Sequence, residues 1–170
     1  AHDRIREGID LIETDVFAEE AFRFANHAMW LQRVRSTFSR KVRKKELPAG
    51  APVDPLDVPV NRTWRLFQLA FVLLNLPSIT RLDHPDRSHE TDAIADLLWF
   101  ATGGGKTEAY LGLAAFTMFL RRLRDPSVQS SGLAVLMRYT LRLLTLDQLG
   151  RAATLVCAMD LMRQQDVEKL

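Results

Sequence analysis

Residues 100–107 read Phe-Ala-Thr-Gly-Gly-Gly-Lys-Thr, and they separate two segments of different character. The upstream segment, residues 95–100 (Ala-Asp-Leu-Leu-Trp-Phe), is a short, mostly apolar run, the pattern of a strand buried in a parallel sheet. The downstream segment, residues 108–124, lacks proline and is rich in helix-favouring alanine, leucine and methionine. A strand, a glycine-rich turn, Lys-Thr and a helix follow one another in a phosphate-binding loop.

The residue types of the loop suit a nucleoside triphosphate. Three consecutive glycines, Gly103 to Gly105, allow positive φ and bring successive N–H groups close to an anion at the start of a helix. Lys106 supplies a positive charge for the β- and γ-phosphates, and the Thr107 hydroxyl can ligate Mg²⁺. The general pattern G-x-x-x-x-G-K-[ST] has glycine where this chain has Phe100, so a glycine-rich turn followed by a chance Lys-Thr is the alternative.

A second apolar run extends the predicted sheet. Asp125-Pro126 ends the helix, and residues 132–138 (Gly-Leu-Ala-Val-Leu-Met-Arg) have the pattern of another buried strand. Two parallel strands joined by a crossover helix predict an α/β fold with the ligand at the carboxyl ends of the strands. Residues 139–144 are then a loop on the ligand side, and Thr145 with Gln148 has the spacing of a capping box for a helix to about residue 163.

The part of the chain before the loop is predicted to be helical. Residues 1–12 are predicted to be a short, charged helical segment. Over residues 14–45, apolar residues recur every three or four positions, which indicates a long amphipathic helix. The basic run near residues 40–45 suits either nucleic acid or a solvated helix end with a dipole-matched charge.

A proline-rich stretch divides the chain. Residues 47–60 contain four prolines and predict a linker between an N-terminal helical segment (1–46) and the ATP-binding part (61–170). A nearly apolar helix over residues 63–76, ended by Pro77, is predicted to be buried. Its Gln68 either bonds a neighbouring loop or faces a ligand, because a buried amide without a partner is costly.

The composition fits a folded domain. The chain has 170 residues, 47% of them hydrophobic, and a formal net charge of only +2, so global charge does not mark a nucleic-acid binder. Its single cysteine, Cys157, is predicted to be buried and excludes an internal disulfide. No membrane-spanning run or signal peptide is apparent, and we expect a cytoplasmic protein. The chain begins on Ala1 and stops within a helical pattern, so we expect a piece of a longer protein.

Three motifs together resemble superfamily 2 helicases. The run 100–109 is similar to their motif I, Arg65-Leu66-Phe67-Gln68 to the adenine-recognition motif R-P-x-Q, and residues 138–148 to motif Ia, which touches nucleic-acid phosphates. Ala101 and Leu66 stand where these motifs usually have proline. The runs 95–113 and 136–153 resemble, more closely, the helicase-like subunit of the DISARM anti-phage defence systems.

The resemblance implies a RecA-like lobe, ATP and Mg²⁺ as ligands, a DNA or RNA backbone as partner, and other subunits of a defence complex. Lys106 and Thr107 would be catalytic, with Thr107 on Mg²⁺. The nucleotide would be held by Gln68, Thr102, Gly103, Gly104, Gly105, Lys106, Thr107 and Glu108, and nucleic acid by Arg138, Tyr139, Thr140, Arg142 and Thr145. The acidic motif and the second lobe of the family are absent from these residues, so this piece alone is expected to bind ATP but hardly hydrolyse it.

Two other functions stay open. A P-loop kinase or a related phosphotransferase would use the same loop, but it needs a lid and a substrate-specific acid. A non-catalytic helical interaction module would leave the loop without a ligand.

Overall fold

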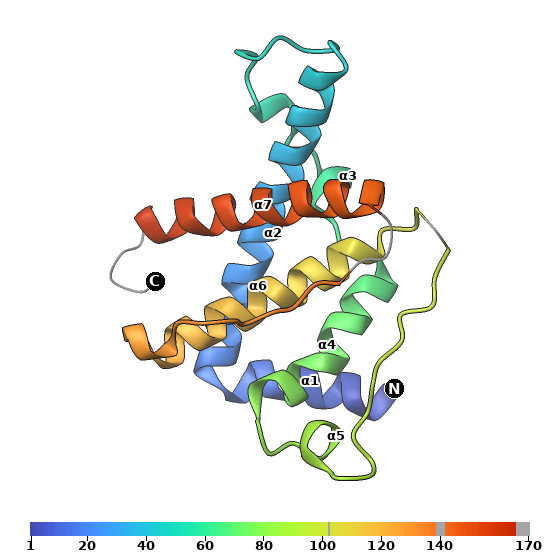
Figure 1. Ribbon diagram of the computed structural model, residues 1–170, viewed down its shortest axis with the longest axis vertical. Coiled ribbons are helices and arrows are strands. Elements are labelled where there is room, and N and C mark those ends of the chain that lie inside the picture. The colour runs from blue at the N-terminus through green and yellow to red at the C-terminus, as the bar shows by residue number, and fades with distance from the viewer. Residues whose placement is uncertain (102, 139–141, 166–170) are drawn as a thin grey trace.

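The computed structural model describes residues 1–101, 103–138 and 142–165, and within these it leaves out the side chains of residues 142–145. The described part is helical (Figure 1), with α1 (His2–Thr14), α2 (Val16–Arg43), α3 (Pro59–Arg62), α4 (Leu66–Thr80), α5 (Pro85–Ser88), α6 (Lys106–Arg124) and α7 (Arg142–Gln165). Two 3₁₀ turns, η1 (Asp54–Leu56) and η2 (Val128–Ser130), lie in the connections. Among the described helices, none has the length and hydropathy of a membrane span.

The predicted α/β fold, a partial RecA-like lobe with parallel strands, is wrong for the described residues, which contain no strand. The two segments predicted as buried strands, residues 95–100 and 132–138, have irregular backbone. Their apolar side chains are largely in solvent: Leu97 is 79% exposed, Trp99 88% and Leu136 77%.

The reason lies in backbone hydrogen bonding. A strand needs a neighbouring strand to complete its N–H and C=O bonds, and within the described residues neither segment has one. The stretch after α6 instead lies along that helix (Figure 1), where the Arg121 guanidinium donates to the carbonyls of Ser130 (2.6 Å) and Leu133 (3.0 Å). An apolar run of strand length does not reveal whether a partner strand exists.

Helix α2 is the central element of the core, and it confirms the long helix predicted over residues 14–45. Asp15 caps it, since its Oδ1 accepts from the amides of Phe17 (2.9 Å) and Ala18 (3.0 Å). A stripe of small buried residues then lets α6 approach closely: Ala18, Ala21, Ala25 and Ala28. The facing residues of α6 include Phe116 and Phe119, both buried, and the ring of Phe119 lies 5.4 Å from that of Phe24.

One apolar cluster joins elements from before and after the proline-rich stretch. It contains Leu11 of α1, Leu76 of α4, Phe116 of α6 and Leu155 of α7, each 2% exposed or less. The helix predicted to start near Thr145 is confirmed as α7, but it begins earlier, so residues 142–144 are helical and the predicted loop 139–144 is wrong there. Cys157 is exposed rather than buried, because it lies on the outer side of α7.

Helix α4 does not end at Pro77 as predicted but continues to Thr80. Proline has no N–H for the carbonyl four residues earlier, which here belongs to Leu73. That carbonyl faces α1: a Cβ built on Gly8 would lie 2.0 Å from the Leu73 oxygen. The Leu73 carbonyl, which Pro77 leaves without a helical hydrogen bond, therefore lies where α1 has Gly8 and no side chain, and the two helices cross closely at this point.

Candidate phosphate-binding loop

The glycine-rich loop has the backbone form that its sequence predicts. Gly103 (φ 79°) and Gly105 (φ 92°) are left-handed, and Gly105 is the N-cap of α6, which starts at Lys106. The Gly104 amide donates to the Ala101 carbonyl at 3.0 Å, closing a turn. A Cβ on Gly103 would meet no described atom within 4 Å, so this end of the loop is open.

Two side chains from the start of α4 hold the loop. The Arg65 guanidinium donates to the Gly104 carbonyl and the Gln68 amide donates to the Gly105 carbonyl, both at 2.7 Å. The Oε1 atom of Gln68 accepts from the Arg65 backbone amide at 2.9 Å, and Gln68 is only 4% exposed. The buried amide predicted to need a partner thus has two, and the two ends of the adenine-like motif both contact the loop.

These bonds orient two successive peptide groups. In a trans peptide the C=O and the following N–H point in opposite directions. Because α4 binds the carbonyls of Gly104 and Gly105, the amides of Gly105 and Lys106 are directed away from α4. They lie there at the start of α6, the end of a helix that carries partial positive charge.

An aromatic stack fixes the residue before the loop. The rings of Phe67 and Phe100 lie 3.9 Å apart at an interplanar angle of 13°. A Cβ on Gly104 would lie 2.4 Å from the Phe100 ring, so glycine is required there by the stack. Phe100, which departs from the usual motif, is part of the packing that holds the loop to α4.

The lysine of the loop folds back on it. The Lys106 amine donates to the Phe100 carbonyl at 2.5 Å, across the glycines. Lys106 and the following Thr107 are both half-buried at the start of α6. A phosphate group bound at the loop would compete with the Phe100 carbonyl for the Lys106 amine.

Glu108 lies one helical turn from Gly105 and is the meeting point of two arginines. Its Oε1 is 3.5 Å from the Arg33 guanidinium of α2, and it is in direct contact with the Arg151 guanidinium of α7. Its Oε2 is buried without a hydrogen-bond partner and would lie 3.3 Å from a Cβ on Gly105. The sequence reasoning missed Arg33 and Arg151, since neither has a local motif and only the packing of α2, α6 and α7 brings them to the loop.

The predicted nucleic-acid residues are less fully defined. Arg138 is exposed on the segment that follows η2. Arg142 and Thr145 belong to the first turn of α7, and their side chains are among those that the structure does not describe. Tyr139 and Thr140, like Thr102 of the phosphate loop, lie outside the described residues.

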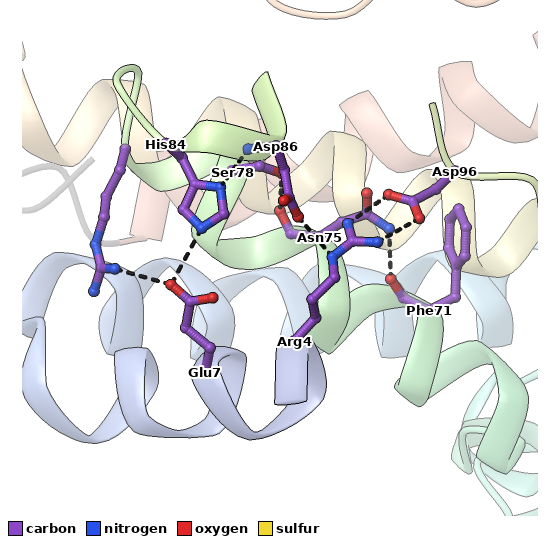
Figure 2. Close-up of polar contacts among 9 residues, drawn as sticks. Arg4, Glu7, Phe71, Asn75, Ser78, His84, Asp86 and Asp96 are labelled. Carbon is purple, nitrogen blue, oxygen red and sulfur yellow. Dashed lines mark hydrogen bonds and ion pairs between the residues drawn. The ribbon is translucent and has the colours of Figure 1, made fainter. Parts of the chain in front are cut away.

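A cluster of ion pairs fixes the segment that leads to the loop (Figure 2). Arg4 of α1 bonds both carboxylate oxygens of Asp96 at 2.7 Å, and its Nε lies 2.7 Å from Asp86. Glu7, one turn along α1, contacts His84 Nε2 at 3.2 Å and Arg81 at 3.1 Å. The hydrogen bond to Asp96 is the main cause of a raised pKa of Arg4, which therefore stays charged at any ordinary pH.

The ion pairs border a hollow of about 350 Å³ that is lined by polar and apolar groups. Within the described residues, no group of three or more His, Cys, Asp or Glu could hold a metal ion. Arg4 of α1 pairs with both Asp86 and Asp96, and these contacts tie the segment before the loop to α1.

Replacing Gln68 tests the hold of α4 on the loop. Gln68→Ala removes bonds to the Gly105 carbonyl and the Arg65 amide, and we expect it to lower the free energy of unfolding by about 1–3 kcal/mol, measured by urea denaturation. Gln164→Ala is the control, because Gln164 is exposed and bonds only within α7 to Asp160 among the described contacts. Equal stability of the two variants would show that Gln68 does not support the loop.

The chain matches no protein-family model. It is 41% identical over 168 residues to the DISARM protein DrmA of Bacillus paralicheniformis (strain ATCC 9945a / NCIMB 11709 / CD-2), an alignment that covers 95% of this chain and 14% of that protein. The predicted relation to a DISARM protein is therefore confirmed, and the chain spans about a seventh of the length of this relative. The match by itself does not test membership of the helicase superfamily.

Proposed function

We propose that residues 103–107 bind the phosphates of Mg²⁺-bound ATP, and that the chain contributes this site to a nucleic-acid-dependent ATPase of the superfamily 2 helicase class in phage defence. The observation that carries the proposal is the pair of 2.7 Å bonds from Arg65 and Gln68 to the Gly104 and Gly105 carbonyls. They leave consecutive amides at a helix start directed away from α4, the arrangement that suits an anion. The relation to a DISARM protein supports the setting in phage defence.

The proposal gives each residue of the loop a task. Lys106 exchanges the Phe100 carbonyl for a phosphate oxygen, and Thr107 ligates Mg²⁺. Gln68 keeps one amide hydrogen after its bond to Gly105, and we assign that hydrogen to adenine. We also assign Thr102 and Glu108 to the nucleotide site.

Nucleic acid would bind beyond the loop, at the start of α7. Charge and hydroxyl contacts to the phosphodiester backbone, without base readout, are assigned to Arg138, Tyr139, Thr140, Arg142 and Thr145. The other subunits of a defence complex are the proposed protein partners. Hydrolysis needs the acidic motif and the arginine finger of the family, which residues 1–170 do not contain, so we expect turnover only in the longer protein.

Lys106→Ala tests the proposal. We expect the dissociation constant of a fluorescent ATP analogue with Mg²⁺ to rise about tenfold or more, because a charge-assisted hydrogen bond is lost. In the longer protein, the same change should abolish DNA-stimulated ATP hydrolysis. Lys44→Ala, at an exposed position after α2, is the control with the same change of charge. Equal affinity for the analogue in both variants would contradict a phosphate site at the loop.

A helical interaction module is the second candidate. Two observations favour it: the described residues are helical, and the Lys106 amine is occupied by a backbone carbonyl of the same chain. In this case the wild-type chain would show no saturable binding of the ATP analogue, although it would retain its fold by circular dichroism. Stimulation by single-stranded DNA in the longer protein would in turn exclude the kinase alternative.

A further inference from the structure

The Arg33–Glu108–Arg151 cluster links the candidate phosphate site to α7. Glu108 lies on the first turn of α6, with its side chain 14% exposed, and Arg151 of α7, 25% exposed, contacts it directly. The guanidinium of Arg33 in α2 lies 3.5 Å from the same carboxylate oxygen. Three helices that are far apart in the sequence therefore meet on one carboxylate.

The carboxylate is placed where a bound phosphate would affect it. Its second oxygen, Oε2, is buried without a partner and lies beside Gly105, the N-cap of α6. A negative charge at this position repels an incoming phosphate unless nearby cations neutralise it. Arg33 and Arg151 supply that neutralisation, so an anion at the loop would add to the negative charge that attracts Arg151 to the start of α6.

We infer that the Glu108–Arg151 contact couples occupancy of the phosphate loop to the position of α7. This inference rests on the proposed function, and it adds the route by which that site is regulated. When an anion binds, it draws the Arg151 side chain toward the loop and holds α7 more firmly against α6. Since α7 begins at Arg142, in the proposed nucleic-acid segment, the same contact joins the two proposed binding regions. Coupling of this kind is reciprocal, so α7 in its held position raises the affinity for the anion.

Hydrogen exchange of the chain with and without Mg²⁺ and ATP tests the coupling. In the wild type, ATP should slow amide exchange within residues 146–165 on the order of fivefold or more. In Arg151→Gln, ATP should still slow exchange at residues 103–110. It should change the exchange rate within α7 by less than about twofold. Arg151→Lys keeps the positive charge, so ATP should still slow amide exchange in α7 to part of the wild-type extent. If Arg151 only packed against α6, the lysine variant would not retain this response.

Arg163→Gln is the matched control, because Arg163 lies on α7 and pairs with Asp160 of the same helix. It should leave the response of α7 to ATP at the wild-type value. Protection of α7 that persists in Arg151→Gln would overturn the coupling while leaving the phosphate site in place. Absence of ATP binding by the wild type would overturn the proposed function and the coupling together.

Discussion

Gly8→Ala is expected to lower the free energy of unfolding by about 2–3 kcal/mol, although alanine favours helix more than glycine does. The added methyl group would lie 2.0 Å from the Leu73 oxygen and 2.8 Å from its carbon, and both atoms belong to the backbone of α4. A backbone cannot rotate away as a flexible side chain can, so α1 and α4 must separate and expose Leu11 and Leu76. Urea denaturation followed by circular dichroism measures the change.

The same substitution at Gly150 gives the control. Gly150 lies within α7, and a Cβ there would have no atom within 4 Å. Gly150→Ala should therefore raise the free energy of unfolding by about 0.5–1 kcal/mol, the ordinary advantage of alanine in a helix. If Gly8→Ala stabilised the chain as Gly150→Ala does, the close crossing of α1 and α4 would be wrong.

Arg4→Ala is also expected to have a large effect, a loss of about 2 kcal/mol in the free energy of unfolding. It leaves Asp86 and Asp96 next to each other without their shared cation. Each of the three side chains is about a fifth exposed, so solvent screens part of the repulsion but not all of it. The segment before the glycine-rich loop should loosen as well, because Arg4 ties it to α1.

Arg6→Ala, which removes an exposed arginine from the same helix, should change stability by no more than about 0.5 kcal/mol. The combination of Arg4→Ala with Asp86→Asn and Asp96→Asn should recover part of the loss, because it removes the two negative charges with which Arg4 had paired. Failure of this combination to recover any stability would mean that the cost of Arg4→Ala comes from lost packing rather than from charge.

Helices α2 and α6 were predictable because their signals are local. The apolar stripe of α2, the dipole-matched charges at its ends and the alanine-rich run of α6 all lie within the elements that they specify. The failure at residues 95–100 and 132–138 has the opposite cause: strand formation depends on a partner that may lie anywhere in the sequence. Pro77 misled the prediction of α4 because the carbonyl left without a helical bond is accommodated by Gly8, which is remote in sequence.

In the candidate site, too, the features set by neighbouring residues were predictable, and those set by the packing of distant helices were not. The positive φ angles of Gly103 and Gly105 follow from the motif itself, and Gln68 was predicted to bond either a loop or a ligand. Its contact with the Gly105 carbonyl, together with that of Arg65 on Gly104, follows from the packing of α4 on α6. The convergence of Arg33 and Arg151 on Glu108 requires three helices in place, and no spacing within one segment could have indicated it.

The placement of α2 has a consequence for biosynthesis. Its alanine stripe is synthesised before the surfaces of α6 and α7 that cover it, which follow more than sixty positions later along the chain (Figure 1). While a ribosome is still translating residues 44–105, the nascent helix presents an uncovered apolar face to its surroundings. We therefore expect α2 to be prone to non-specific apolar contacts until α6 has emerged from the exit tunnel.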